Sequence, residues 1–174
     1  MYISARSDYA LRAMLAVAAS GDGGHGPPDS RTGEVDRPDT GTRPHGGGGR
    51  SEGGGGGELV KAASLAQAQG IPLSFLQGIL LDLRRAGLLH SHRGAEGGYA
   101  LTRPASQISV GDVLRAVGGS LTTVRGLPAG DAGYHGVATG LRDVWLAVDG
   151  AIAVVVDHTT LTDLLVHREQ MPAH

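Results

Sequence analysis

The stretch Ile71–Leu101, IPLSFLQGILLDLRRAGLLHSHRGAEGGYAL, carries the clearest structural pattern of the chain. Its first half places apolar residues at helical spacing and is closed by Gly87, which predicts a helix from Ser74 to about Ala86. Its second half has two short runs joined by a glycine-rich tip, which predicts a two-stranded hairpin. A helix followed directly by a hairpin is the order found in a winged helix-turn-helix.

The helix at 74–86 separates an apolar face from a hydrogen-bonding face. We expect Ser74 to cap it. The apolar face consists of Phe75, Leu76, Ile79, Leu80 and Leu83. The opening turn of a recognition helix reaches base edges, so Ser74, Phe75 and Gln77 are predicted near bases. Arg84, like Arg85, suits phosphate contact. The alternative is a core helix of an unrelated α-bundle.

The hairpin is predicted to pair Leu88–His92 with Gly98–Thr102. Its tip, residues 93–97, sets Arg93 among glycines that let the backbone approach a narrow groove. Arg93 and Gly94 are therefore predicted to touch DNA. The alternative is an ordinary turn with a solvated arginine.

Further helices surround this block. The pattern predicts a helix over Ser4–Ala18, capped by Ser4 or Ser7, and a short one over Ala62–Gln69 that stops at Gly70. Glu58–Val60 is expected to form a strand pairing with the hairpin. The remaining predicted helices are Ser109–Val117, Gly136–Asp157 and a final one, capped by Thr159 or Thr160, that runs through Leu165.

The predicted helix at 136–157 has an apolar seam. Its members fall at alternating three- and four-residue steps, as in a coiled coil. They are Leu141, Val144, Val148, Ala151 and Val155, with Trp145, Ile152 and Val156 widening the stripe. So broad an apolar face near the end of a chain is typical of an interface, and we expect a homodimer.

The mainly α chain therefore divides into a winged helix-turn-helix (1–19 and 58–104), linker and dimerisation helices (105–167) and a tail (168–174). The helix-turn-helix spans about 62–85 and the wing 88–102. Between these parts, residues 20–57 hold half of the 30 glycines and almost no apolar residue. Such a segment cannot offset the entropy of ordering and is predicted to be a disordered insertion.

Composition narrows the class of protein. The chain has no cysteine, which excludes disulfides and thiolate-held metals. It has no signal-peptide pattern and no apolar run near the ~20 residues that span a bilayer, so we expect a soluble cytoplasmic protein without membrane partners. The net charge is −2, but the predicted winged helix carries +3 and residues 105–174 carry −3.

No catalytic motif is present, and we expect no enzyme. His90 and His92 would share one face of a strand and could ligate a metal, with Asp157, His158 or His135 as a third ligand. Surface histidines beside a wing are the commoner outcome, so no metal site is predicted.

Four segments together resemble the Rrf2 family of bacterial winged-helix regulators, the class of IscR and NsrR. They are SDYALRAMLAVA, the block from SLAQAQG through GGYAL, SVGDVLRAV, and DVWLAV with TTLTDLL. The resemblance implies a homodimeric transcription factor whose long helix pairs across the two-fold axis. It also implies that the helix from Ser74 enters the major groove and the Arg93 wing the minor groove. Ser4, Arg6 and Tyr9 would approach the DNA backbone, and Tyr99 belongs to the matching wing motif.

The chain departs from this family where a [2Fe–2S] cluster would bind. Cluster-holding members have three cysteines in the segment that is Val124–Thr139 here, and this chain has none. Thr139 and Arg142 stand where the last cysteine and a nearby histidine would fall. We therefore expect no cofactor.

The expected function is a dimeric repressor that binds a pseudo-palindromic operator in double-stranded DNA. The main alternative is a dimeric ligand- or protein-binding module that uses a winged helix without DNA. The effector stays open: Val124–His135 could line a small-molecule pocket, or the protein could be constitutive.

Overall fold

The computed structural model describes residues 3–21 and 58–170, with the side chains of 168–170 left aside. The predicted insertion, from residue 22 onward, and the tail beyond residue 170 lie outside the described residues. The described part is mostly helical, with two small antiparallel sheets. The fold class predicted from the sequence is confirmed.

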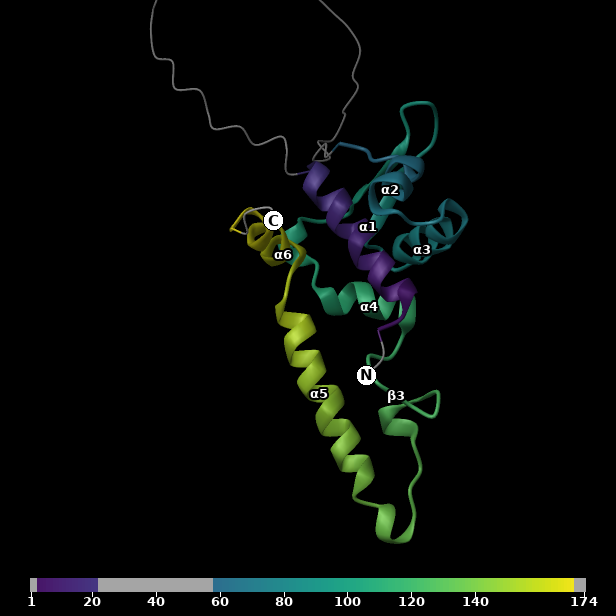
Figure 1. Cartoon of the computed structure of the whole chain (residues 1–174), viewed down its shortest axis with the longest axis vertical. Coiled ribbons are helices and arrows are strands. Elements are labelled where there is room, and N and C mark those ends of the chain that lie inside the picture. The colour runs from purple at the N-terminus through teal and green to yellow at the C-terminus, as the bar shows by residue number, and fades with distance from the viewer. Residues whose placement is uncertain (1–2, 22–57, 171–174) are drawn as a thin grey trace, which may run out of the picture.

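The elements form a helical head and a long arm (Figure 1). The head holds α1 (Ala5–Gly21), α2 (Ala62–Gln69), α3 (Leu73–Arg85), β1 (Leu89–His92), β2 (Gly98–Leu101), the 3-10 turn η2 (Ala105–Gln107) and α4 (Val110–Gly118). The arm holds β3 (Thr123–Val124), β4 (Leu127–Pro128), the turns η3 (Ala129–Asp131) and η4 (Gly136–Ala138), and α5 (Leu141–His158). The last helix, α6 (Leu161–Gln170), returns to the head and packs on α1 and η2.

The core of the head forms around α1 and α3. Met14 of α1 and Leu76, Ile79, Leu80 and Leu83 of α3 are all fully buried. Burying each such side chain stabilises the fold by roughly 1.5–3 kcal/mol. One apolar face of α3 is therefore fixed against α1, and its opposite face is left for solvent.

The start of α3 differs slightly from the prediction, and its end agrees with it. The helix begins one residue early, because Pro72 takes the N-cap position and its carbonyl accepts from Leu76 N at 3.0 Å. Ser74 therefore lies within the first turn and does not cap it. Phe75 was wrongly placed on the buried face, since its side chain is 40% exposed. At the other end, Gly87 adopts φ 75° as predicted, and Leu88 N donates to Leu83 O at 3.0 Å.

The wing forms as predicted, with Leu89 opposite Leu101 and His92 opposite Gly98. Val60 pairs with the wing through two 2.9 Å backbone bonds with Tyr99. The pairing with the hairpin is confirmed at this residue, but residues 58–59 do not form the expected strand. The close approach of Val60 requires glycine at 98, where a Cβ would lie 2.8 Å from Val60 O.

Three helices have different limits from those predicted. α1 continues to Gly21 rather than ending at Ala18, and α6 continues to Gln170 rather than Leu165. The long helix starts at Leu141 and not at Gly136, because Gly136 takes φ 60° and leads into a 3-10 turn. The capping predictions fare better: Ser4 caps α1, and Thr160 caps α6.

α5 is anchored to the head at its C-terminal end. Arg115 of α4 donates to both carboxylate oxygens of Asp157, at 2.6 and 2.8 Å. Beside it, Val110 N donates to Thr159 O at 2.8 Å. From this anchor, α5 extends away from the head alongside the β3 segment (Figure 1).

Candidate nucleic-acid interface

The solvent-facing side of α3 carries the residues predicted to reach bases. Ser74, Phe75 and Gln77 are all exposed in its first two turns. Because the buried residues hold the opposite face of α3 in the core, these three side chains stand on one rigid helix. Such a surface can enter a groove without rearranging the head.

The start of α1 is tied to α3 by two side chains. Arg6 forms an ion pair with Asp82, and its Nη2 also donates to Gly78 O at 3.4 Å. Tyr9 packs edge-on against Phe75, with ring centroids 5.8 Å apart. Two of the three residues that the family resemblance placed near the DNA backbone thus contact α3.

Ser4 has a structural role at the same end of α1. Its Oγ accepts from Ser7 N at 3.1 Å, as an N-cap does. The two hydroxyl oxygens are 2.9 Å apart. Ser4 remains half-exposed, so the position is open to an approaching backbone.

A basic groove lies between the start of α2, the end of α3 and the wing. It encloses about 390 Å³ and is bordered by Lys61, Arg84 and Arg93, with Gly94 and Tyr99. Arg84 Nη1 donates to Ser91 Oγ at 3.2 Å, which holds this arginine toward the wing. Three cations around one groove suit phosphate binding.

Lys61 was missed by the sequence analysis. It is the sole lysine of the chain and sits at the N-cap position of α2. A cation at the start of the helix-turn-helix is a signal that could have found it. Only the fold places it beside Arg84 and Arg93.

His90 and His92 share a face as expected, with their rings edge-to-face at 5.3 Å. Within residues 3–21 and 58–170, no group of three or more potential ligands gathers around them or elsewhere.

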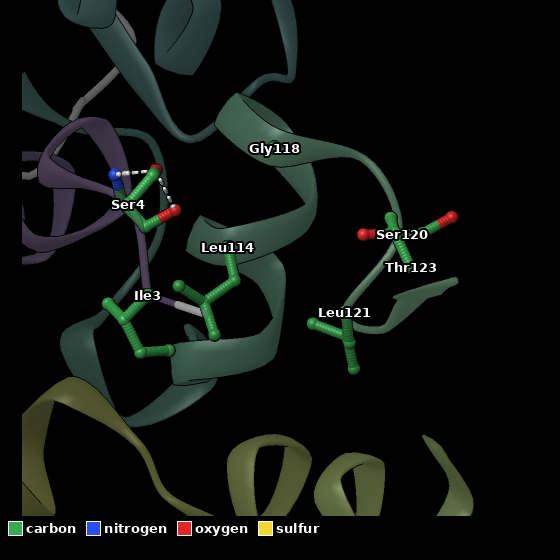
Figure 2. Close-up of a pocket in the computed structure, with 8 residues that line it drawn as sticks. Ile3, Ser4, Leu114, Gly118, Ser120, Leu121 and Thr123 are labelled. Atoms are coloured by element: carbon green, nitrogen blue, oxygen red, sulfur yellow. Dashed lines mark hydrogen bonds between the residues drawn. The ribbon is translucent and has the colours of Figure 1, made fainter. Parts of the chain in front are cut away.

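Two hollows lie near the chain that follows α4, and the segment considered for an effector lines one of them. One encloses about 370 Å³, and Figure 2 shows Ile3 and Leu114 on one side of it, with Ser120, Leu121 and Thr123 on the chain that follows α4. The other, of about 330 Å³, lies between α4 and α5 and is lined in part by Thr122, Pro128 and Ala129. Residues 128–130 are thus the part of the predicted pocket segment that lines a hollow.

The predicted dimerisation seam on α5 is split by exposure. Leu141, Val144, Val148 and Val155 are exposed, whereas Trp145 and Ile152 are half-buried. Val156, expected to widen the seam, is buried within the chain itself. The exposed residues form an apolar stripe along α5.

Comparison with known proteins agrees with this architecture. The Rrf2 family, described as an iron-dependent transcriptional regulator, matches residues 53–167. The chain belongs to the Rrf2 family. A Mycobacterium tuberculosis (strain H37Rv) protein named as a helix-turn-helix-type transcriptional regulator is 40% identical over 166 residues, which cover 94% of this chain and 81% of that protein. The regulator IscR of Cereibacter sphaeroides is 35% identical over 62% of this chain and 71% of its own length.

Solved structures show the same fold. The global cysteine regulator CymR of Bacillus subtilis superposes with a TM-score of 0.65 at 24% identity, covering 96% of this chain and 98% of that one. IscR of T. potens superposes with a TM-score of 0.63 at 27% identity, covering 100% of this chain and 94% of that one. This Rrf2 chain is therefore a DNA-binding helix-turn-helix transcriptional regulator.

None of its described helices is both long and apolar enough to cross a bilayer.

A cysteine-held iron–sulfur cluster does not fit the donor set of this Rrf2 chain. The sequence has no cysteine to supply a thiolate. In the segment Val124–Thr139, His135 is the one imidazole and Asp131 the one carboxylate. These two side chains cannot supply the four protein ligands that a [2Fe–2S] cluster takes.

Proposed function

We propose that this Rrf2 protein is a homodimeric, sequence-specific repressor that works without an iron–sulfur cluster. The observation that carries the proposal is the joint surface of α3 and the wing. Ser74, Phe75 and Gln77 are exposed on α3, and the basic groove with Arg84 and Arg93 lies beside its far end. This arrangement offers base-reading side chains and phosphate-binding cations on one side of the head.

Pairing of two protomers through α5 supports a two-fold operator. The exposed stripe with Leu141, Val144 and Val148 is the kind of surface that a second copy of the same helix would bury. Two heads held by one pair of helices would then read two inverted half-sites.

Repression follows from steric occlusion in this proposal. The described helices belong either to the DNA-binding head or to the α5 arm. A dimer bound to a promoter would block RNA polymerase by its bulk alone, so repression needs no additional surface for contacting polymerase. Without a cluster, release from DNA would depend on another signal, and the hollow beside residues 128–130 is the candidate effector site.

The proposal is tested by selection of duplex DNA from a random pool with the full chain. We expect an enriched, pseudo-palindromic sequence whose binding persists at physiological salt. A reporter driven by a promoter that contains this sequence should lose expression when the protein is present. Binding without sequence preference that vanishes at physiological salt would instead support a ligand- or protein-binding module.

A further inference from the structure

Arg6 and Asp82 link two elements that lie far apart in the sequence. The guanidinium of Arg6, on α1, pairs with the carboxylate of Asp82, on α3. It also donates to Gly78 O, one helical turn before Asp82. A single side chain of α1 therefore spans a full turn of the recognition helix.

This link lies along the exposed edge of α3. Ser74, Gly78 and Asp82 recur every four residues, so they form one stripe of the helix. A Cβ on Gly78 would lie 3.9 Å from Arg6 Nη1, so the guanidinium rests directly against the helix there. The anchored stripe thus includes Ser74, one of the residues proposed to read bases.

A second contact joins α1 and α3 at another point along α3. Tyr9, one turn after Arg6 on α1, touches Phe75 near the start of α3. Arg6 holds the later turns of α3 at Gly78 and Asp82. The buried apolar face already holds α3 in the core, and these two contacts at separate points limit the small rotations about the helix axis that remain.

The charges also argue against a free phosphate-binding role for Arg6. Asp82 is the one acidic residue of α3, and unpaired it would repel DNA phosphates. Arg6 neutralises it, so the pair as a whole adds no net attraction to a polyanion. The two side chains are 34% and 31% exposed, at the margin of the core.

We propose that Arg6 and Asp82 are specificity-determining positioning residues. Their pair sets the rotation of α3 against α1 so that Ser74 and Gln77 meet the correct base edges. Its contribution is to discrimination between sequences rather than to electrostatic attraction. This inference rests on the proposed DNA-reading function.

The test compares affinity for the duplex enriched by the wild-type protein with affinity for a mixed-sequence duplex of equal length. Charge effects act on both duplexes and cancel in this ratio, whereas loss of positioning lowers it. We expect Arg6→Ala, Asp82→Asn and the double variant each to lower the ratio by about two- to five-fold, the range of an exposed ion pair. The double variant should be no worse than either single one, and Arg6→Lys should retain part of the ratio.

Asp8→Asn is the matched control. Asp8 pairs with Arg12 within α1, at 3.5 Å. Arg12 also donates to Gln69 O at the end of α2, a bond that does not involve Asp8. The Asp8 carboxylate is therefore not part of the link between α1 and α3. Asp8→Asn removes one negative charge, as Asp82→Asn does, and the ratio of affinities for the enriched and mixed-sequence duplexes should not change. Thermal unfolding of every variant without DNA verifies that the head is folded.

Salt dependence separates the outcomes. If Arg6→Ala lowers the affinity for both duplexes equally and reduces the log–log salt slope by about 0.9, Arg6 contacts phosphate and the positioning role is wrong. The positioning role would also be wrong if Asp82→Asn increased operator affinity while leaving the ratio between the two duplexes unchanged. A wild-type protein without any sequence preference would refute the proposed function itself, a result distinct from both.

Discussion

At the scale of single residues, the head separates side chains that hold α3 from those that can meet DNA. Leu76 and Leu83 are buried, whereas Ser74 and Gln77 are exposed on the same helix. Arg93 belongs to the second group, since its side chain is exposed at the tip of the wing and borders the basic groove. Its effect should therefore appear in binding and not in folding.

Replacing Arg93 with alanine should weaken operator binding by up to about tenfold at fixed salt and lower the salt slope by about one. The reason is the loss of one cation from the groove. The measurement is a fluorescence-anisotropy titration at several salt concentrations. Arg125→Ala is the control, because Arg125 lies in the β3–β4 turn and packs over Tyr134. Unchanged affinity for Arg93→Ala would remove the wing from the mechanism.

Asp157 should make the anchor of α5 sensitive to acid. The hydrogen bonds from Arg115 hold the pKa of Asp157 below its ordinary value of 3.8. A carboxyl with a lowered pKa stabilises the folded state above its ordinary pKa, and this stabilisation is lost as the pH falls through the lowered value. Asp157→Asn should therefore flatten the decline in stability below about pH 4. Urea unfolding across this pH range measures the free energy of unfolding of the wild-type protein and the variant. An identical decline in the two proteins would show that Asp157 does not cause the acid sensitivity.

At the scale of elements, short local signals set where helices begin and end. Ser109 and Asp112 form a reciprocal capping box at the start of α4, with bonds of 3.0 and 3.1 Å. Because Gly98 has no side chain, the backbone at Val60 can lie close to the wing. The first signal is local in sequence, whereas the second depends on a contact between distant residues.

Ser109→Ala should destabilise the head by about 1 kcal/mol, because the backbone N–H of Asp112 loses its acceptor. Chemical denaturation followed by circular dichroism measures the change. The control is Ser106→Ala in the exposed η2 turn, which should have little effect. Equal losses in the two variants would show that the cap is not the cause.

Gly98→Ala should destabilise the head by about 1–3 kcal/mol, since its Cβ would press on the backbone of Val60. Hydrogen exchange at Tyr99 should accelerate, because its bond to Val60 O is the one that must open. Gly133→Ala, with nothing within 4 Å of the added Cβ, is the control. Preserved protection at Tyr99 would contradict this account.

At the scale of the whole molecule, α5 projects from the head with much of its apolar surface uncovered. Val144 is 51% exposed and Val155 is 65% exposed. A single protomer leaves this surface in water, and pairing would remove it. Operator binding by two heads would then depend on the α5 stripe.

Val144→Asp should convert the proposed dimer to a monomer and reduce operator affinity by at least tenfold, because a charge buried in the seam is strongly unfavourable. Sedimentation velocity measures the oligomeric state. Val144→Leu keeps the surface apolar and should remain dimeric. A dimer that persists in the aspartate variant would place the interface elsewhere.

Sequence alone determined the order helix, turn, wing and long helix, because these depend on local periodicity, caps and glycines such as Gly70 and Gly87. It also determined the absence of thiolate chemistry. Which side chains meet depends on the folded arrangement of the helices. The exposure of Phe75, the grouping of Lys61 with Arg84 and Arg93, and the pairing of Arg6 with Asp82 all arise from packing between segments distant in the chain. Local patterns cannot encode such contacts, since the same exposed helix position can meet solvent, a neighbouring helix or DNA.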